Sequence, residues 1–186
     1  MIVRDVLDFW FEGDPNQFRH ARWFAADPNF DAAIRERFGF THRAALDGAL
    51  DGWAVTPDGA LALVILLDQF SRNIHRGCFR AFAGDAHARR IAREAIERGA
   101  DASLTPVQRH FLYRPFAHSE HIADQDLSVR LVAKLIGEFS GEARDYAERH
   151  RDIIRRFGRF PHRNAALRRV NTPAEMTYLA EPARGF

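Results

Sequence analysis

Apolar residues recur along most of this chain at the three- and four-residue spacing of one helical face. Proline-containing pairs mark where several helices begin, because each pair places a capping side chain before a proline suited to the first helical turn. These pairs are Asp14-Pro15, Asp27-Pro28, Thr56-Pro57, Thr105-Pro106 and Thr172-Pro173. The pattern predicts helices over residues 2–11, 15–24, 28–38, 40–50, 57–73, 84–98, 106–117, 119–139, 142–157 and 173–180.

Two of these helix starts also have the spacing of a capping box, in which each of two side chains accepts a backbone amide of the other residue. They are Thr105 with Gln108 and Thr172 with Glu175. No segment shows the sustained apolar and polar alternation of a strand, so we predict an all-α protein. The connections are short and no Ser/Gly/Pro-rich linker separates two parts, which favours a single helical domain over residues 1–186.

The predicted helix over residues 119–139 turns polar toward its start. Its apolar face carries Leu131 and Leu135, and the same face continues backwards through polar residues. These polar residues are His118, His121, Asp124, Gln125 and Ser128. Because a polar group taken from water needs a partner, we expect this face to meet other polar groups.

Two further helices carry polar side chains on an apolar face. Residues 60–67 are apolar all round, as in a central helix, and Asp68 and Arg72 follow at the four-residue spacing of an ion pair. We expect these two charges to be buried together. In the predicted helix over residues 142–157, His150 lies on the apolar stripe.

These inward-facing polar groups have two interpretations that the sequence leaves open. In the first, they form satisfied hydrogen-bond networks that hold the helices in register. In the second, they converge on a pocket where arginines bind an anion, a histidine transfers a proton and a carboxylate orients the imidazole. The arginines of that pocket would be Arg72, Arg76, Arg159 and Arg163, the histidine His118 or His150, and the carboxylate Glu120 or Asp124.

We expect no cofactor and no metal site. His118, His121 and Asp124 share a helical face, but the Glu-x-x-His and His-Glu-x-x-His patterns of helical metal sites are missing from the sequence. Nucleophile elbows, Walker loops and glycine-rich dinucleotide turns are missing too. Cys78 is the only cysteine, which excludes an intrachain disulfide.

Charge is unevenly distributed, although the net charge is only +2. Residues 149–186 carry nine arginines against three carboxylates, which suits docking on the acidic N-terminal part or binding an anionic partner. The arginines scatter around their helix rather than forming a stripe, so we do not expect nucleic acid as the partner.

The apolar runs are too short for a membrane protein. The longest covers residues 60–67, whereas a bilayer requires roughly 20 apolar residues, so we expect no membrane segment. Asp5, Asp8 and Glu12 interrupt the apolar residues at the N-terminus, unlike the apolar core of a signal peptide. We therefore predict a cytoplasmic protein.

Three longer motifs follow one another along the chain. They are Asp68-Gln69-Phe70-Ser71-Arg72-Asn73-Ile74-His75-Arg76-Gly77, His118-Ser119-Glu120 with Asp124-Gln125, and Phe157-Gly158-Arg159-Phe160-Pro161-His162-Arg163-Asn164. In this order they resemble a bacterial family, domain of unknown function 924, and similar positions elsewhere extend the resemblance over nearly the whole chain. The resemblance implies a tetratricopeptide-like fold, an antiparallel array of helical hairpins, although no tetratricopeptide repeat pattern is readable in the sequence.

The resemblance implies a set of motif residues but no established reaction, substrate or cofactor. The set is Asp68, Gln69, Arg72, Asn73, Arg76, His118, Ser119, Glu120, Asp124, Gln125, His150, Arg159, His162, Arg163 and Asn164. Ser71 stands where the family usually has proline, and His121 matches no motif position. We predict that the three motifs converge on one site, with His118, His150 and Glu120 as candidate catalytic residues and the others as ligand-binding residues.

Two functions remain open, and with them the question of whether the protein is an enzyme. The first is a binding module for a peptide or a small anionic ligand, since helical-repeat folds commonly present concave surfaces. The second is a hydrolase or transferase that acts on an anionic substrate, with His118 or His150 as general acid or base. The sequence does not determine the oligomeric state.

Overall fold

The predicted all-α class is confirmed. The computed structural model of the protein describes residues 2–18, 20–137 and 139–181, and none of these residues lies in a strand. The tetratricopeptide-like arrangement stays a prediction.

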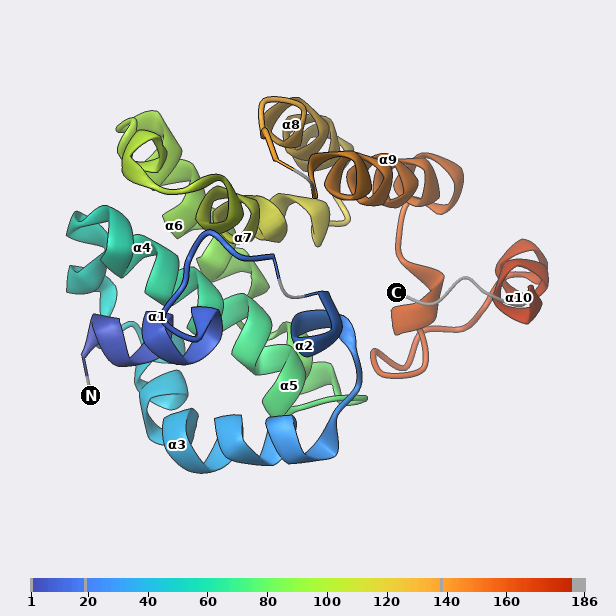
Figure 1. Cartoon of the computed structure of the whole chain (residues 1–186). Coiled ribbons are helices and arrows are strands. Elements are labelled where there is room, and N and C mark those ends of the chain that lie inside the picture. The colour runs from blue at the N-terminus through green and yellow to red at the C-terminus, as the bar shows by residue number, and fades with distance from the viewer. Residues whose placement is uncertain (1, 19, 138, 182–186) are drawn as a thin grey trace.

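Figure 1 shows α4 and α7 in the middle of the molecule, α1 and α3 on one side, α8 and α9 on the other, and α10 at the end of the C-terminal segment. In chain order the elements are α1 (Val3–Phe11), α2 (His20–Phe24), α3 (Pro28–Leu46), η1 (Asp51–Val55), α4 (Pro57–Val64), η2 (Ile65–Phe70), α5 (Ser71–Ile74), η3 (Phe79–Phe82), α6 (Asp85–Glu97), η4 (Ala100–Ser103), α7 (Pro106–Ala117), α8 (Ile122–Val132), α9 (Ser140–Phe157), η5 (Pro161–Arg163) and α10 (Pro173–Ala180).

The helix-start signals are confirmed at four of the five proline pairs. The capping side chains at the starts of α3, α4, α7 and α10 accept backbone amides, and α7 and α10 have the predicted capping boxes. The fifth prediction is wrong, because α2 begins only at His20. The Asp14 carboxylate accepts the amide of Asn16 at 3.0 Å, so this aspartate closes a local turn instead of capping a helix.

The bounds of three other predicted helices, those over residues 28–38, 40–50 and 119–139, differ from the prediction. The chain from Pro28 to Leu46 is one helix that continues through Gly39. A glycine inside a helix costs about 1 kcal/mol, which the buried side chains on α3 outweigh. The helix predicted over residues 119–139 is confined to α8, Ile122–Val132, because the backbone turns directly after it, at Ala133 and Lys134.

The core is centred on α4 and η2. Every residue from Ala60 to Leu67 is fully buried, as their unbroken apolar sequence predicts. Helices α1, α6 and α7 pack against α4, and α3 packs against η2. Beside them, Trp10, Trp23 and Phe111 form an aromatic cluster in which the Trp23 indole donates to the Trp10 carbonyl at 2.9 Å.

The helical run from Pro57 to Ile74 is continuous, but its middle part is a π-helix. Residues 65–70 take the wider turn of the π-helix, with α4 before them and α5 after them. Such a turn shifts the side chains that follow relative to an α-helix, and π-helical turns occur frequently at functional sites. Asp68 lies inside this segment.

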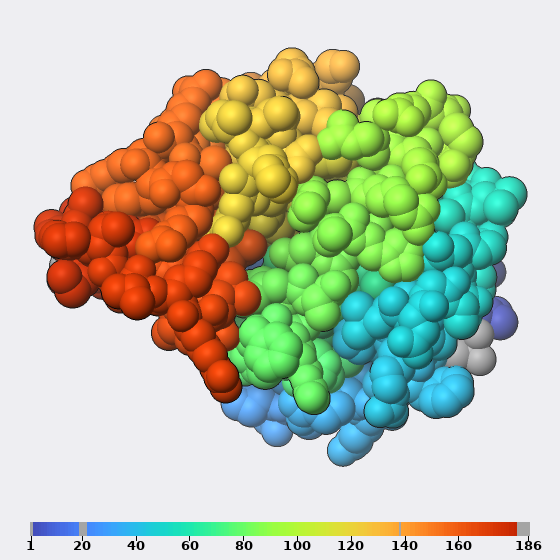
Figure 2. Space-filling model, turned by 180° about the vertical axis from the view of Figure 1, so that it is seen from behind, coloured from blue at the N-terminus to red at the C-terminus, as the bar shows by residue number. Residues whose placement is uncertain are grey.

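A C-terminal segment, residues 158–181, extends from the end of α9. Gly158 ends α9 in the left-handed conformation, with φ +70°, which glycine adopts without strain. A small apolar cluster of Ile153, Ile154, Phe160 and Tyr178 joins the segment to α9. Figure 2 shows the segment, in red-orange, meeting the green part of the chain along a narrow seam. None of the described helices is both long and apolar enough to cross a membrane.

Candidate functional site

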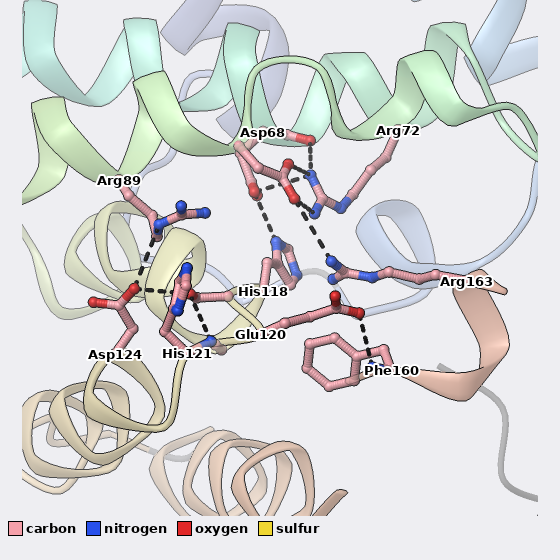
Figure 3. Close-up of polar contacts among 12 residues, drawn as sticks. Asp68, Arg72, Arg89, His118, Glu120, His121, Asp124, Phe160 and Arg163 are labelled. Carbon is pink, nitrogen blue, oxygen red and sulfur yellow. Dashed lines mark hydrogen bonds and ion pairs between the residues drawn. The ribbon is translucent and has the colours of Figure 1, made fainter. Parts of the chain in front are cut away.

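The Asp68 carboxylate joins two of the three sequence motifs. It is fully buried, and its Oδ1 accepts from Nη1 of Arg72 at 2.9 Å and contacts Nδ1 of His118 at 2.7 Å (Figure 3). The predicted Asp68–Arg72 ion pair and the burial of Asp68 are therefore confirmed, while the Arg72 side chain is only partly buried, at 21% exposed. His118 is 50 residues away along the chain, so this contact depends on the packing of α7 against η2.

Arg72 connects Asp68 to a second carboxylate, Asp85, at the start of α6. Its Nη1 and Nη2 donate to the two Asp85 oxygens at 2.8 and 3.0 Å. Burial by itself lowers the pKa of Arg72, but the two neighbouring carboxylates raise it above its usual value. Gly84, directly before Asp85, lets the start of α6 lie close to the π-helical segment, since a Cβ at this position would lie 2.3 Å from the Leu67 carbonyl oxygen.

His118 is a neutral imidazole held between Asp68 and α9. Burial, followed by repulsion from Arg72 and Arg114, keeps its pKa well below the usual range. Because a carboxylate oxygen accepts hydrogen bonds, Nδ1 of His118 carries the proton in this contact and Nε2 is left as an acceptor. That Nε2 faces the Tyr146 hydroxyl at 3.4 Å.

His150 packs against the ring of Tyr146. Its Nδ1 lies 2.9 Å from the Tyr146 carbonyl oxygen, and the two rings are 3.8 Å apart. Burial and the proximity of His118 hold the pKa of His150 well below its usual value. Both predicted catalytic histidines are therefore neutral, and both contact the same tyrosine.

Arg163 brings the third motif to the same place. Its guanidinium lies 4.4 Å from the ring centre of Phe160 and 4.8 Å from that of Phe82, and it is 3.7 Å from Asp85. Burial and repulsion from Arg72 lower the pKa of Arg163 to about 10. Figure 3 shows this side chain reaching from the C-terminal segment toward Asp68 and Arg72.

Contacts join these residues in a closed ring, which we call the central cluster. From Asp68 the ring passes to Arg72, Asp85 and Arg163 through the ion pairs above. From Arg163 the ring continues to Phe160 through the contact of the guanidinium with the aromatic ring, and from Phe160 to His150 at 5.3 Å between ring centres. It then passes through Tyr146 to His118, which contacts Asp68 and closes the ring. With Arg114, which adjoins Tyr146, the members are Asp68, Arg72, Asp85, Arg114, His118, Tyr146, His150, Phe160 and Arg163.

Sequence reasoning missed four members of the central cluster: Phe160, which lies within the third motif, and Asp85, Arg114 and Tyr146, which lie outside all three motifs. Arg114 is the most unusual, because it is 7% exposed and no carboxylate among the described residues contacts it. It lies 4.2 Å from the ring centre of Tyr146 and 4.8 Å from that of Phe24, and its buried Nε has no hydrogen-bond partner. Its position four residues before His118, on the same face of α7, was the signal available in the sequence.

Glu120 joins the loop before α8 to the C-terminal segment. Its carboxylate accepts the Phe160 amide at 2.8 Å and pairs with both terminal nitrogens of Arg169 at 2.7 and 3.0 Å. These bonds lower the pKa of Glu120 against the opposing effect of burial. The carboxylate that orients His118 is therefore Asp68, rather than Glu120 or Asp124 as we expected.

Other motif residues lie in hydrogen-bond networks outside the ring. Gln69 donates to Asp68 directly behind the cluster. Ser119 donates to Asp124 at 2.7 Å, and Asp124 also pairs with Arg93 on α6. Gln125 donates to the carbonyls of residues 116, 117 and 119, which fixes the turn between α7 and α8.

The structure places four further motif residues, Asn73, Arg76, Arg159 and Asn164, away from the central cluster. Asn73 and Arg76 both donate to Asp31 on α3. Arg159 pairs with Glu175, so it is not one of the arginines that face the cluster.

Asn164 donates to Asn171 within the C-terminal segment. His162 lies at the edge of the central cluster, with its ring centre 5.4 Å from that of Phe160, and burial followed by repulsion from Arg163 lowers its pKa to about 4. No group of three histidine, cysteine or acidic side chains in the described part of the chain has the arrangement of a metal site.

Comparisons with known proteins give relatives but no activity. A model of the family described as bacterial protein of unknown function (DUF924) matches residues 6–183. The solved structure of a protein of unknown function, ATU0120 from Agrobacterium tumefaciens, is 43% identical, has a TM-score of 0.86 and covers 96% of each chain. No curated protein matches.

Proposed function

Because the chain belongs to the DUF924 family, whose description assigns no activity, we propose from the central cluster that this protein binds a small anionic ligand. The ligand would lie between α7, α9 and the C-terminal segment. A peptide would meet the same guanidinium groups through its own carboxylate.

The observation that carries this proposal is the presence of two buried guanidinium groups to which no carboxylate of residues 2–18, 20–137 and 139–181 is hydrogen-bonded. Arg163 is 6% exposed, its closest carboxylate is 3.7 Å away, and its Nε has no partner. Arg114 has no carboxylate contact among the described residues. Burial of an incompletely paired charge is costly, and an anion placed between the two arginines would remove much of that cost.

The surroundings of the two arginines support a binding site. The Tyr146, His150 and Phe160 rings pack together beside them, and ligand sites commonly combine aromatic side chains with a few charged groups. His118 and His150 are neutral, so neither adds a positive charge to those of the two arginines at neutral pH.

Thermal shift measurements test the proposal. The probes are sulfate, phosphate, citrate and acetate, with acetamide as the neutral counterpart of acetate, at constant ionic strength. We expect at least one anion to raise the melting temperature of the natural protein, and the rise to shrink in Arg163→Gln. Arg130→Gln is the matched control, because Arg130 is exposed on α8, so it should respond like the natural protein. No response to any anion would contradict the proposal.

A second candidate function is acid–base catalysis on an anionic substrate, by a hydrolase or transferase. The observation that favours it is the pairing of Asp68 with a neutral His118 whose Nε2 faces a hydroxyl group. A carboxylate that orients a neutral imidazole is the usual arrangement of a general base. An activity found by substrate screening should fall at least about 100-fold in His118→Ala. Activity that survives both His118→Ala and His150→Ala would exclude these histidines from catalysis.

The single domain over residues 1–186 and the cytoplasmic location also remain proposals. Coincident unfolding transitions monitored by tryptophan fluorescence and far-UV circular dichroism would support one cooperative domain. Cell fractionation of the natural bacterium tests the location.

A further inference from the structure

The charges of the central cluster leave one cation without a counterpart. Asp68 and Asp85 contribute two negative charges, and both contact Arg72. Asp85 also pairs with Arg163 at 3.7 Å. Two carboxylates thus balance two guanidinium groups, and the remaining positive charge belongs to Arg114.

The orientation of Arg114 restricts where a ligand can contact it. The rings of Phe24 and Tyr146 lie 4.8 and 4.2 Å from its guanidinium carbon, so aromatic groups cover the guanidinium. The N–H donors lie in the guanidinium plane and point outward from its edge. A planar acceptor with two oxygens, which is the geometry of a carboxylate, fits that edge in a bidentate pair.

We infer that the ligand is a monocarboxylate and that Arg114 binds its carboxylate group. This inference rests on the proposed anion-binding function and specifies the ligand class for that site. One carboxylate neutralises the one unbalanced guanidinium. A phosphate or sulfate dianion brings a second negative charge into a buried site that has no further unbalanced cation among the described residues, and an uncompensated buried charge is expensive.

Two sources supply this chemistry, namely small organic acids and the C-terminus of a peptide. The probes therefore form two neutral-matched pairs: benzoate with benzamide, and a tripeptide with a free C-terminus together with its C-terminal amide. Sulfate serves as the dianion. Binding is measured by titration calorimetry at pH 7.5 and constant ionic strength.

We expect the carboxylate of at least one pair to bind at least about tenfold more tightly than its neutral partner and than sulfate. The pair that responds identifies the source. Replacement of Arg114 by methionine should weaken this binding by about 10- to 100-fold, the value of a charge-assisted bidentate pair. Arg130→Met should bind like the natural protein.

Arg114→Lys gives a second readout if the methionine variant unfolds. It keeps the charge but loses the planar pair of donors, so carboxylate binding should weaken while the protein stays folded. Unchanged carboxylate binding in either folded variant would overturn the inference. Tighter binding of sulfate than of every carboxylate would also overturn it but leave the anion-binding function intact, whereas the binding of no anion would remove both.

Discussion

Replacement of Asp68 by alanine should destabilise the protein far more than removal of a comparable surface carboxylate. Asp68 is fully buried and bonded to both Arg72 and His118. Asp8 is the matched control, because it also pairs with an arginine four residues away, at 3.3 Å, but its side chain is 56% exposed. The two substitutions remove the same atoms from a buried and an exposed ion pair.

The expected cost follows from the groups left behind. Breaking a buried ion pair on one side typically costs about 3–5 kcal/mol. Arg72 keeps both bonds to Asp85, which favours the low end, whereas His118 loses the acceptor of its Nδ1–H, which adds about 1 kcal/mol or more. We expect Asp68→Ala to lower the free energy of unfolding by about 3–4 kcal/mol. For Asp8→Ala we expect at most about 1 kcal/mol.

Urea unfolding monitored by tryptophan fluorescence measures this difference. With a slope of about 2 kcal/mol per molar urea, the midpoint should fall by about 1.5–2 M in Asp68→Ala and by less than about 0.5 M in Asp8→Ala. Asp68→Asn keeps the shape and one acceptor oxygen but removes the charge, so its midpoint should lie between those of Asp68→Ala and the natural protein.

Equal midpoints for Asp68→Ala and Asp8→Ala would refute the reasoning, because the buried contacts of Asp68 would then contribute no more than a surface pair. A large loss in Asp68→Ala with no loss in Asp68→Asn would show that hydrogen bonding rather than charge is the stabilising factor.

Stability should also decrease below about pH 6.5, because the unfolded chain takes up a proton on His118 and on His150 while the folded protein, in which both pKa values are lowered by burial, does not. Below that pH, the free energy of unfolding measured from urea curves should fall by up to about 1.4 kcal/mol per pH unit for each of the two histidines. At higher pH the two histidines should not change it. A free energy of unfolding that stays constant between pH 7.5 and 5 would contradict the burial of both histidines as neutral groups. Glu120→Gln should weaken the ion pair with Arg169 and loosen residues 158–181, and hydrogen exchange should show about tenfold faster opening there, corresponding to about 1.4 kcal/mol. Identical protection in the variant would show that Glu120 does not hold the segment.

The sequence by itself determined the helical class and most helix starts. Capping side chains, prolines and apolar spacing act within a few residues, so they are readable without knowledge of the fold. The polar residues on apolar faces were also readable, and the predicted Asp68–Arg72 pair is four residues apart on a single helical run. Local signals failed at Asp14, where a turn competes with a helix cap.

Only the tertiary structure decided which polar residues meet. Asp68 contacts His118 across 50 residues of sequence, and Glu120 contacts Arg169 across 49. Asn73 belongs to the same motif as Asp68, yet it pairs with Asp31 on α3. Neighbours in sequence thus point to different partners, because their directions depend on the turn of the helix and on the elements packed around it.

The same dependence explains why Asp85, Arg114 and Tyr146 were missed. Asp85 reaches Arg72 because Gly84 lets α6 approach the π-helical segment, and no periodicity in the sequence encodes that approach. In the sequence Arg114 looks like any helical arginine, and only the packed structure shows that aromatic rings cover it and that none of the carboxylates described in the structure pairs with it. Burial and the absence of a partner are properties of the packed protein, because each depends on atoms contributed by distant parts of the chain.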